Sequence, residues 1–139
     1  VEHTAFDRDA VRDSRSHRIA AMMRPADTVE VFLCREPVDF RKSIDGLALL
    51  VERTLGLDPF AKRLHVFCNR RRSAVKVLYW ERCGFVLWYK RLEKARFPWP
   101  RDRGETPLVL TGRELNAVLD GIDVFAMRPH EEILYTSVL

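Results

Sequence analysis

Three consecutive arginines, Arg70, Arg71 and Arg72, are the side chains whose type and spacing most directly indicate a chemistry. No acidic residue lies within five positions of them, so the like charges repel one another and no sequence neighbour compensates them. Guanidinium groups bind phosphate oxygens through paired N–H donors. We therefore expect an anionic partner at this run, and the phosphate backbone of a nucleic acid fits it.

The arginines belong to a basic third of the chain. Residues 62–103 contain 13 Lys and Arg against three acidic residues, whereas the whole chain of 139 residues has a net charge of only +4. Aromatic residues alternate with the cations here, and their rings can either stack on unpaired bases or fill the core, which is the commoner use. The candidate DNA-binding residues are Arg70, Arg71, Arg72, Lys76, Lys90 and Arg91, with Trp80, Trp88 and Trp99 as candidate stacking residues.

Groups typical of catalysis and metal binding are sparse. The four histidines are scattered, and no HExxH, GxGxxG or GxxxxGK[ST] spacing occurs. Asp39 is interpreted as a helix N-cap and Asp45 as a helix-surface residue, and neither as a metal ligand. His65 lies in an apolar run and is interpreted as a hydrogen-bonded strand histidine. The sequence therefore predicts no enzyme activity, no metal, no cofactor and no small-molecule substrate.

The composition is typical of one globular domain that can bury a core, because 47% of the residues are hydrophobic. No apolar run reaches transmembrane length, and the first residues do not resemble a secretory signal, so no membrane association is expected. The three cysteines, Cys34, Cys68 and Cys83, fit no zinc spacing, and we expect them to be reduced thiols. Together these features predict a cytoplasmic protein.

Hydrophobic periodicity places the candidate site on an α+β domain. Strands are expected over 28–34, 64–68, 74–80 and 85–89, with a short edge strand over 96–99. A helix is expected from Phe40 to Leu55, ended by Gly56 and Pro59, and a capping box from Thr111 to Glu114 predicts a second helix over 112–121. These elements predict a mostly antiparallel sheet of four to five strands with two helices packed against it.

The arginines fall in the loop 69–73, between two of the expected strands. The next turn, 81–84, ends in Gly84, which we expect to supply the positive φ that such turns need. Alternation places Val75 and Val77 on one face of the strand and Lys76 and Leu78 on the other. Neither face is wholly polar, so both faces should be at least partly covered.

The domain is expected to cover residues 25–123. Residues 1–24 lack a sustained apolar period and are expected to form a disordered or weakly helical extension, and residues 124–139 an irregular tail with one strand over 133–135. Met22 and Met23 stand immediately before the first strand, so residues 1–21 are a candidate upstream readthrough.

Two long segments of unusual sequence are PVDFRKSIDGLALLV (37–51) and FCNRRRSAVKVLYWERCGFVLWYKRLEKARFPWP (67–100). In these segments the chain resembles the Orf2-type protein, also called transposition protein B, of insertion-sequence-sixty-six transposons. The similarity runs from about residue 29 to residue 122 and leaves out both ends. The resemblance implies an accessory role in moving a transposable element within bacterial DNA, beside a larger transposase that carries the catalytic carboxylates. It assigns no catalytic residue.

The residues and the resemblance together predict a non-catalytic accessory protein that binds DNA, or a transposase–DNA complex, through phosphate contacts without base readout. The alternative is an adaptor that holds the larger transposase through an apolar sheet surface without direct DNA binding. A third hypothesis is a single-strand or RNA binder that stacks bases on the tryptophans. The salt dependence of DNA binding separates the first two, because an adaptor lacks a steep electrostatic contribution.

Overall fold

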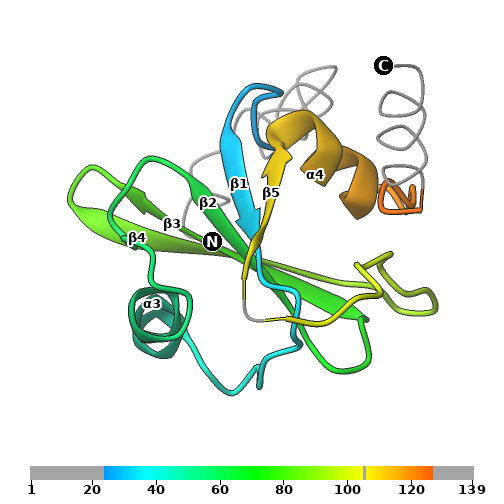
Figure 1. Cartoon of the computed structure of the whole chain (residues 1–139), viewed down its shortest axis with the longest axis horizontal. Helices are drawn as coiled ribbons and strands as arrows, with labels where there is room; N and C mark the ends of the chain where they lie inside the picture. Colours follow the sequence, from blue (N-terminus) through cyan, green and yellow to red (C-terminus); the bar gives the residue numbers. More distant parts are fainter. Residues whose placement is uncertain (1–23, 105, 127–139) are drawn as a thin grey trace, which may run out of the picture.

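A five-stranded sheet in the order β4–β3–β2–β1–β5 forms the centre of the protein (Figure 1). The computed structural model describes residues 24–104 and 106–126. The neighbouring strands are antiparallel except β1 and β2, which are parallel. The strands are β1 (Glu30–Leu33), β2 (Leu64–Cys68), β3 (Ala74–Glu81), β4 (Gly84–Arg91) and β5 (Leu108–Thr111). The α+β fold class, with a mostly antiparallel sheet, is confirmed.

Two helices cover opposite faces of this sheet (Figure 1). Helix α3 (Ile44–Arg53) connects β1 to β2 and packs through Leu47 on β3 and β4. Helix α4 (Gly112–Leu119) follows β5 and packs through Leu115 on β5 and β1. The strands supply Phe67 and Leu78 to the core on the α3 side, and Val66, Val75 and Val77 to the core on the α4 side. The expected alternation and the covering of both faces are therefore confirmed.

Helix α3 begins at Ile44 and not at Phe40, so the sequence-based start is wrong. Its N-cap is Ser43, which makes no side-chain capping bond. Asp39 is not the N-cap, because its carboxylate accepts hydrogen bonds from the backbone N–H and the guanidinium of Arg41, at 2.6 to 3.1 Å.

Lys76 gives a physical reason for the late start of α3. Its ammonium group donates hydrogen bonds to the carbonyls of Phe40 (2.9 Å) and Lys42 (2.8 Å). The same group lies 4.8 Å from the centroid of the Phe40 ring. Residues 40–42 are therefore held against the sheet, and the helix begins only after them.

The turn between β3 and β4 takes its positive φ at Arg82 (57°). Gly84 instead pairs with Glu81 as the first residue of β4. The prediction that Gly84 supplies the positive φ is therefore wrong. Glycine is not required at this position, because a Cβ on Gly84 would meet no atom within 4 Å.

Residues 96–99 form no strand, contrary to expectation. Phe97 and Trp99 are 2% and 3% exposed and belong to the core on the α4 side. The backbone N–H of Phe97 donates to the carbonyl of Arg72 (2.8 Å), and the indole Nε1 of Trp99 donates to the carbonyl of Cys34 (3.1 Å). Burial of the two rings, and not ladder pairing, holds this segment.

Strand β5 is not predicted by the sequence pattern. It has only four residues, and it pairs antiparallel with β1. The capping box that follows it is confirmed, since Thr111 Oγ1 accepts from the N–H of Glu114 while the Glu114 carboxylate accepts from the N–H of Thr111. No helix within the described ranges is long and apolar enough to span a membrane.

The expectations for the two ends of the chain fall largely outside the described residues. Arg24 is described, and its guanidinium donates to the carboxylate of Asp120 at 3.0 Å. Phe125, the second residue of the expected tail, is 8% exposed and packs into the core on the α4 side. The rest of the extension (1–23) and of the tail (127–139), with the strand expected over 133–135, lies outside the described residues.

Candidate nucleic-acid interface

Residues 69–73, the arginine loop, join β2 to β3 at one end of the sheet. The side-chain oxygen of Asn69 accepts hydrogen bonds from the backbone N–H groups of Ser73 (2.9 Å) and Ala74 (3.2 Å). Its amide nitrogen donates to Ser73 Oγ (3.0 Å). The N–H of Arg72 donates to the carbonyl of Asn69 (3.0 Å), with Arg72 in the left-handed region at φ 59°. The loop is therefore held by bonds that leave the three guanidinium groups unused.

The guanidinium groups of the arginine loop have no anionic partner in the described part of the chain. Arg70 and Arg71 are exposed and Arg72 is half-buried. None of the three forms an ion pair with an acidic residue of the described ranges. No carboxylate of the described ranges therefore compensates their positive charges, which leaves them open to solvent ions or to an anionic ligand.

The segment that follows β4 lies beside the arginine loop. The N–H of Leu92 donates to the carbonyl of Ser73 (2.7 Å), and that of Phe97 donates to the carbonyl of Arg72 (2.8 Å). Between these two anchors, Lys94 and Arg96 are exposed and form no ion pair with a described residue. Together they extend the cationic surface. We call Arg70, Arg71, Arg72, Lys94 and Arg96 the basic cluster.

The sequence-based site leaves out Lys94 and Arg96. The high density of cations over 62–103 indicates them. The backbone bonds that place these two residues beside the arginine loop join positions about twenty residues apart and cannot be inferred from local patterns.

The other three expected DNA contacts do not join the basic cluster as a group. Burial lowers the pKa of Lys76, whose ammonium is occupied by two backbone carbonyls. Lys90 lies opposite Val75 and therefore on the α4 side, whereas Arg91 points to the α3 side. Arg91 also pairs with Glu93 at 3.3 Å. Lys76 and Lys90 are half-buried, whereas Arg91 is exposed and lies at the end of the sheet that carries the loop.

The structure does not bring the three tryptophans together. Trp80 lies on the α3 side near the far end of β3, about 20 Å from the arginine loop at the usual rise per residue. Its ring contacts those of Phe60 and Phe85, each at a centroid distance of 4.9 Å. Trp88 lies opposite Val77 and packs against the core on the α4 side. Trp99 is buried in that core, where no base could reach its ring. A stacking surface made of all three is therefore absent from the described fold.

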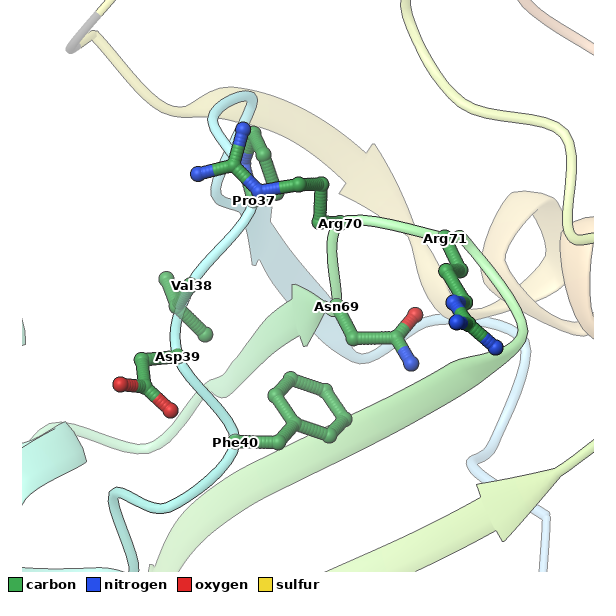
Figure 2. Close-up of a pocket in the computed structure, with 7 residues that line it drawn as sticks. All are labelled: Pro37, Val38, Asp39, Phe40, Asn69, Arg70 and Arg71. Atoms are coloured by element: carbon green, nitrogen blue, oxygen red, sulfur yellow. The ribbon is translucent and has the colours of Figure 1, made fainter.

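A pocket of about 390 Å³ lies between the arginine loop and the segment after β1 (Figure 2). Figure 2 shows Phe40 and Asn69 facing each other across it, with the Arg70 side chain reaching toward Pro37. The N–H of Val38 donates to the carbonyl of Cys68 (2.9 Å) and so holds the two walls together. The lining residues are Pro37, Val38, Asp39, Phe40, Asn69, Arg70 and Arg71. The two segments that carry the family resemblance thus meet at this pocket.

One acidic side chain lies on the pocket wall. The guanidinium of Arg41 binds the Asp39 carboxylate and lowers its pKa to about 2, so the carboxylate is ionised but paired at neutral pH. The Arg41 side chain is 91% exposed, so the pair adds little to stability. Its main consequence is that Asp39 does not leave an uncompensated negative charge beside the arginines.

The remaining titratable groups offer no second site in the described ranges. No group of three or more potential metal ligands occurs among the described residues. His65 is 1% exposed with neither ring nitrogen hydrogen-bonded to a described residue, so the expected hydrogen bond is wrong, and burial lowers its pKa to about 4. The three cysteines are free thiols, as expected, with Cys34 and Cys68 buried and Cys83 exposed.

Comparison with known proteins identifies a family and two relatives. The family described as IS66 Orf2 like protein matches residues 29–129. Two uncharacterized proteins of Sinorhizobium fredii (strain NBRC 101917 / NGR234), y4jC and y4hO, are 29% and 33% identical over 102 residues. The matched region is 73% of this chain and 86% and 88% of those proteins. No solved structure matches the chain.

Proposed function

The chain belongs to the IS66 Orf2-like family of transposition-associated proteins, and from this premise we propose that it is a non-catalytic accessory factor that binds DNA through the basic cluster. The contacts are with phosphate groups, and they position the protein on DNA without reading the base sequence. The partners are the DNA of the element and the larger transposase that acts on it.

One observation carries this proposal, namely three adjacent guanidinium groups without a carboxylate partner among the described residues. Two of them are exposed, and the hydrogen bonds of Asn69 hold the loop that carries them. Exposed cations whose only role is to keep a protein surface hydrated are usually interspersed with acidic residues. An arginine run on a hydrogen-bonded loop, without a carboxylate partner in the described ranges, favours a polyanion as its partner.

The test is the variant Arg70→Ala/Arg71→Ala/Arg72→Ala, compared with wild type in a salt titration of duplex DNA binding. Each lost phosphate contact flattens the dependence of log affinity on log salt by about 0.9, so the slope should change by roughly 2 to 3. A matched control, Arg53→Ala/Lys62→Ala/Arg113→Ala, removes the same charge from exposed positions elsewhere on the fold. This control should change the slope far less.

Circular dichroism checks that both variants remain folded. If the triple loop variant is folded and keeps both the affinity and the slope of wild type, the arginine loop does not contact DNA. The second candidate function then takes precedence.

That second candidate is an adaptor that holds the transposase, and the aromatic cluster of Phe60, Trp80 and Phe85 favours it. Phe60 is 54% exposed, and its ring lies 4.9 Å from Trp80 and 5.3 Å from Phe85 between centroids. An exposed ring that packs on two half-buried ones is typical of a protein-binding surface. An adaptor would retain the transposase in a pull-down after nuclease treatment and lose it in a Phe60→Ser variant.

A further inference from the structure

We infer that the pocket between residues 37–40 and the arginine loop receives one unpaired nucleotide, with its base against Phe40 and its phosphate at Arg70 and Arg71. The inference rests on the proposed function, because it assumes that the basic cluster binds DNA. It goes beyond it by naming the DNA structure that is recognised, a nucleotide outside the base-paired stack.

The two kinds of wall in the pocket carry the inference. Pro37, Val38 and Phe40 offer apolar surface on the wall after β1, and the arginine loop contributes the cationic side chains of Arg70 and Arg71, with that of Arg70 reaching toward Pro37. A phosphate alone would leave the apolar wall unused. The volume of about 390 Å³ falls within the range of small-molecule pockets, roughly 300 to 1,000 Å³. A single nucleotide combines a planar ring with an anionic group and so matches both walls.

The base of such a nucleotide must be unpaired. In a duplex the faces of the bases are covered by their neighbours, so only the grooves and the phosphates are accessible to a protein. A base outside the stack exposes its faces and can contact an aromatic ring. The basic cluster lies beside the pocket, where it would bind phosphates of the flanking strand.

The pocket walls are fixed before any ligand arrives. Asn69 holds the arginine loop, and the bond from Val38 N–H to the Cys68 carbonyl holds the opposite wall. The Phe40 ring is held from the sheet side by the ammonium of Lys76, at 4.8 Å from its centroid. A ligand therefore does not have to order the backbone of the two walls or the Phe40 ring, which favours affinity.

Asp39 lies in the pocket wall, but its negative charge is paired and does not repel a phosphate. Arg41 neutralises the carboxylate through bonds of 2.6 to 3.1 Å. Carboxylate oxygens accept hydrogen bonds from the amino groups of bases. The pocket thus offers acceptors for the base as well as donors for the phosphate.

The experiment compares three DNAs that share one sequence. The first is a fully paired duplex, the second is the same duplex with one extra unpaired nucleotide, and the third has an abasic residue in place of that unpaired nucleotide. The abasic DNA keeps the phosphate and lacks the base. Wild type should bind the unpaired nucleotide roughly 5- to 150-fold more tightly than the abasic DNA, the range that base–aromatic contacts give. A free deoxynucleoside monophosphate should compete far more weakly, because it engages none of the flanking cations.

A variant pair identifies the ring that makes the contact. Phe40→Leu keeps an apolar side chain and removes the aromatic face, so it should abolish the preference for the base and keep the affinity for the paired duplex. Phe32→Leu is the matched control, since Phe32 is likewise a half-buried ring and does not line the pocket. It should keep the preference. Near-ultraviolet circular dichroism checks that both variants pack as wild type does.

Several outcomes overturn the inference, and they differ from those that overturn the proposed function. If wild type binds all three DNAs equally with a steep salt dependence, the pocket takes no base but the proposed function stands. If none of the DNAs binds in a salt-dependent manner, the proposed function fails as well. If an acidic peptide, and no nucleotide, shifts the amide resonances of Phe40 and Asn69, the pocket is a protein-docking site. If a free mononucleotide binds as tightly as the DNA, the ligand is a free nucleotide.

Discussion

The ammonium group of Lys76 donates hydrogen bonds to the backbone carbonyls of Phe40 and Lys42. These bonds fix the pocket wall and set the start of α3. Lys76→Met keeps the length of the side chain and removes both bonds. Because a hydrogen bond from a charged donor contributes about 1.5 to 3 kcal/mol net when buried and less when partly exposed, we expect the free energy of unfolding to fall by roughly 1 to 3 kcal/mol.

Urea denaturation measures this loss. Lys94→Met is the matched control, since Lys94 is exposed and forms no ion pair with a described residue, and its effect should stay within about 0.5 kcal/mol. Equal stabilities of the two variants would show that the Lys76 bonds do not hold residues 40–42.

The imidazole of His65 is buried without a hydrogen-bond partner among the described residues, and burial lowers its pKa from 6.5 to about 4. As the pH falls from 6.5 to 4, the unfolded chain binds a proton that the folded protein does not, so the unfolded state gains stability. Above pH 6.5 the imidazole is neutral in both states and contributes no pH dependence. The protein should therefore lose roughly 3 kcal/mol of stability between pH 7 and pH 4 through this group.

His65→Leu removes the titrating group and its unsatisfied nitrogens. Urea denaturation at pH 7 and pH 4 should show a flatter pH dependence for the variant, and at pH 7 it should be at least as stable as wild type. A variant that is less stable at pH 7 and retains the full pH dependence would mean that the imidazole has a hydrogen-bond partner and that another group titrates.

At the scale of elements, the contact between α4 and the start of β1 depends on Gly112. A Cβ at this position would lie 1.8 Å from the carbonyl oxygen of Ala26 and 2.8 Å from Cγ1 of Val29. The N–H of Gly112 also donates to the carbonyl of Val29 (2.8 Å), so the two backbones cannot separate without losing this bond. Gly112→Ala should therefore destabilise the fold by about 2 kcal/mol or more, as overpacking does.

Thermal unfolding checks this expectation, because 1 kcal/mol corresponds to a shift of about 4 to 8 °C for a domain of 60 to 100 residues. Gly84→Ala is the control, since a Cβ at Gly84 meets no atom within 4 Å. Its midpoint should stay near that of wild type. Equal midpoints for the two variants would contradict the close approach of α4 to β1.

The elements that sequence patterns predict well are those whose pairing is local. β2, β3 and β4 follow one another through short loops, so alternation and turn residues define them. β5 is missed because a segment of only four residues becomes a strand here by pairing with β1, about eighty residues earlier. The start of α3 is misplaced for a similar reason, because Lys76 on a distant strand holds residues 40–42.

The same distinction applies to the candidate site. Three adjacent arginines indicate an anion-binding loop from the sequence alone. The pocket needs Phe40 and Asn69 side by side, and only the bonds from Val38 to Cys68 and from Lys76 to Phe40 bring them together. Trp99 has the residue type of a base-stacking group, but its position in the core depends on a long-range bond to the Cys34 carbonyl.

At the scale of the whole molecule, the two candidate interfaces lie at opposite ends of β3. The arginine loop precedes Ala74 at one end, and the aromatic cluster surrounds Trp80 near the other, about 20 Å away at the usual rise per residue. A partner protein on the aromatic cluster would leave the basic cluster open. DNA and transposase could therefore be bound by one copy of the protein at the same time.

The pairing of β1 with β5 also fixes the order in which a growing chain can complete this fold. As the chain leaves the ribosome, β2, β3 and β4 can pair with one another as soon as they emerge, because their contacts are close in sequence. β1 keeps one open edge, and Val31 and Leu33 lack the cover of α4, until residues 108–119 follow. We therefore expect the arginine loop to form before residues 108–119 emerge, and the domain to reach its full stability only after them.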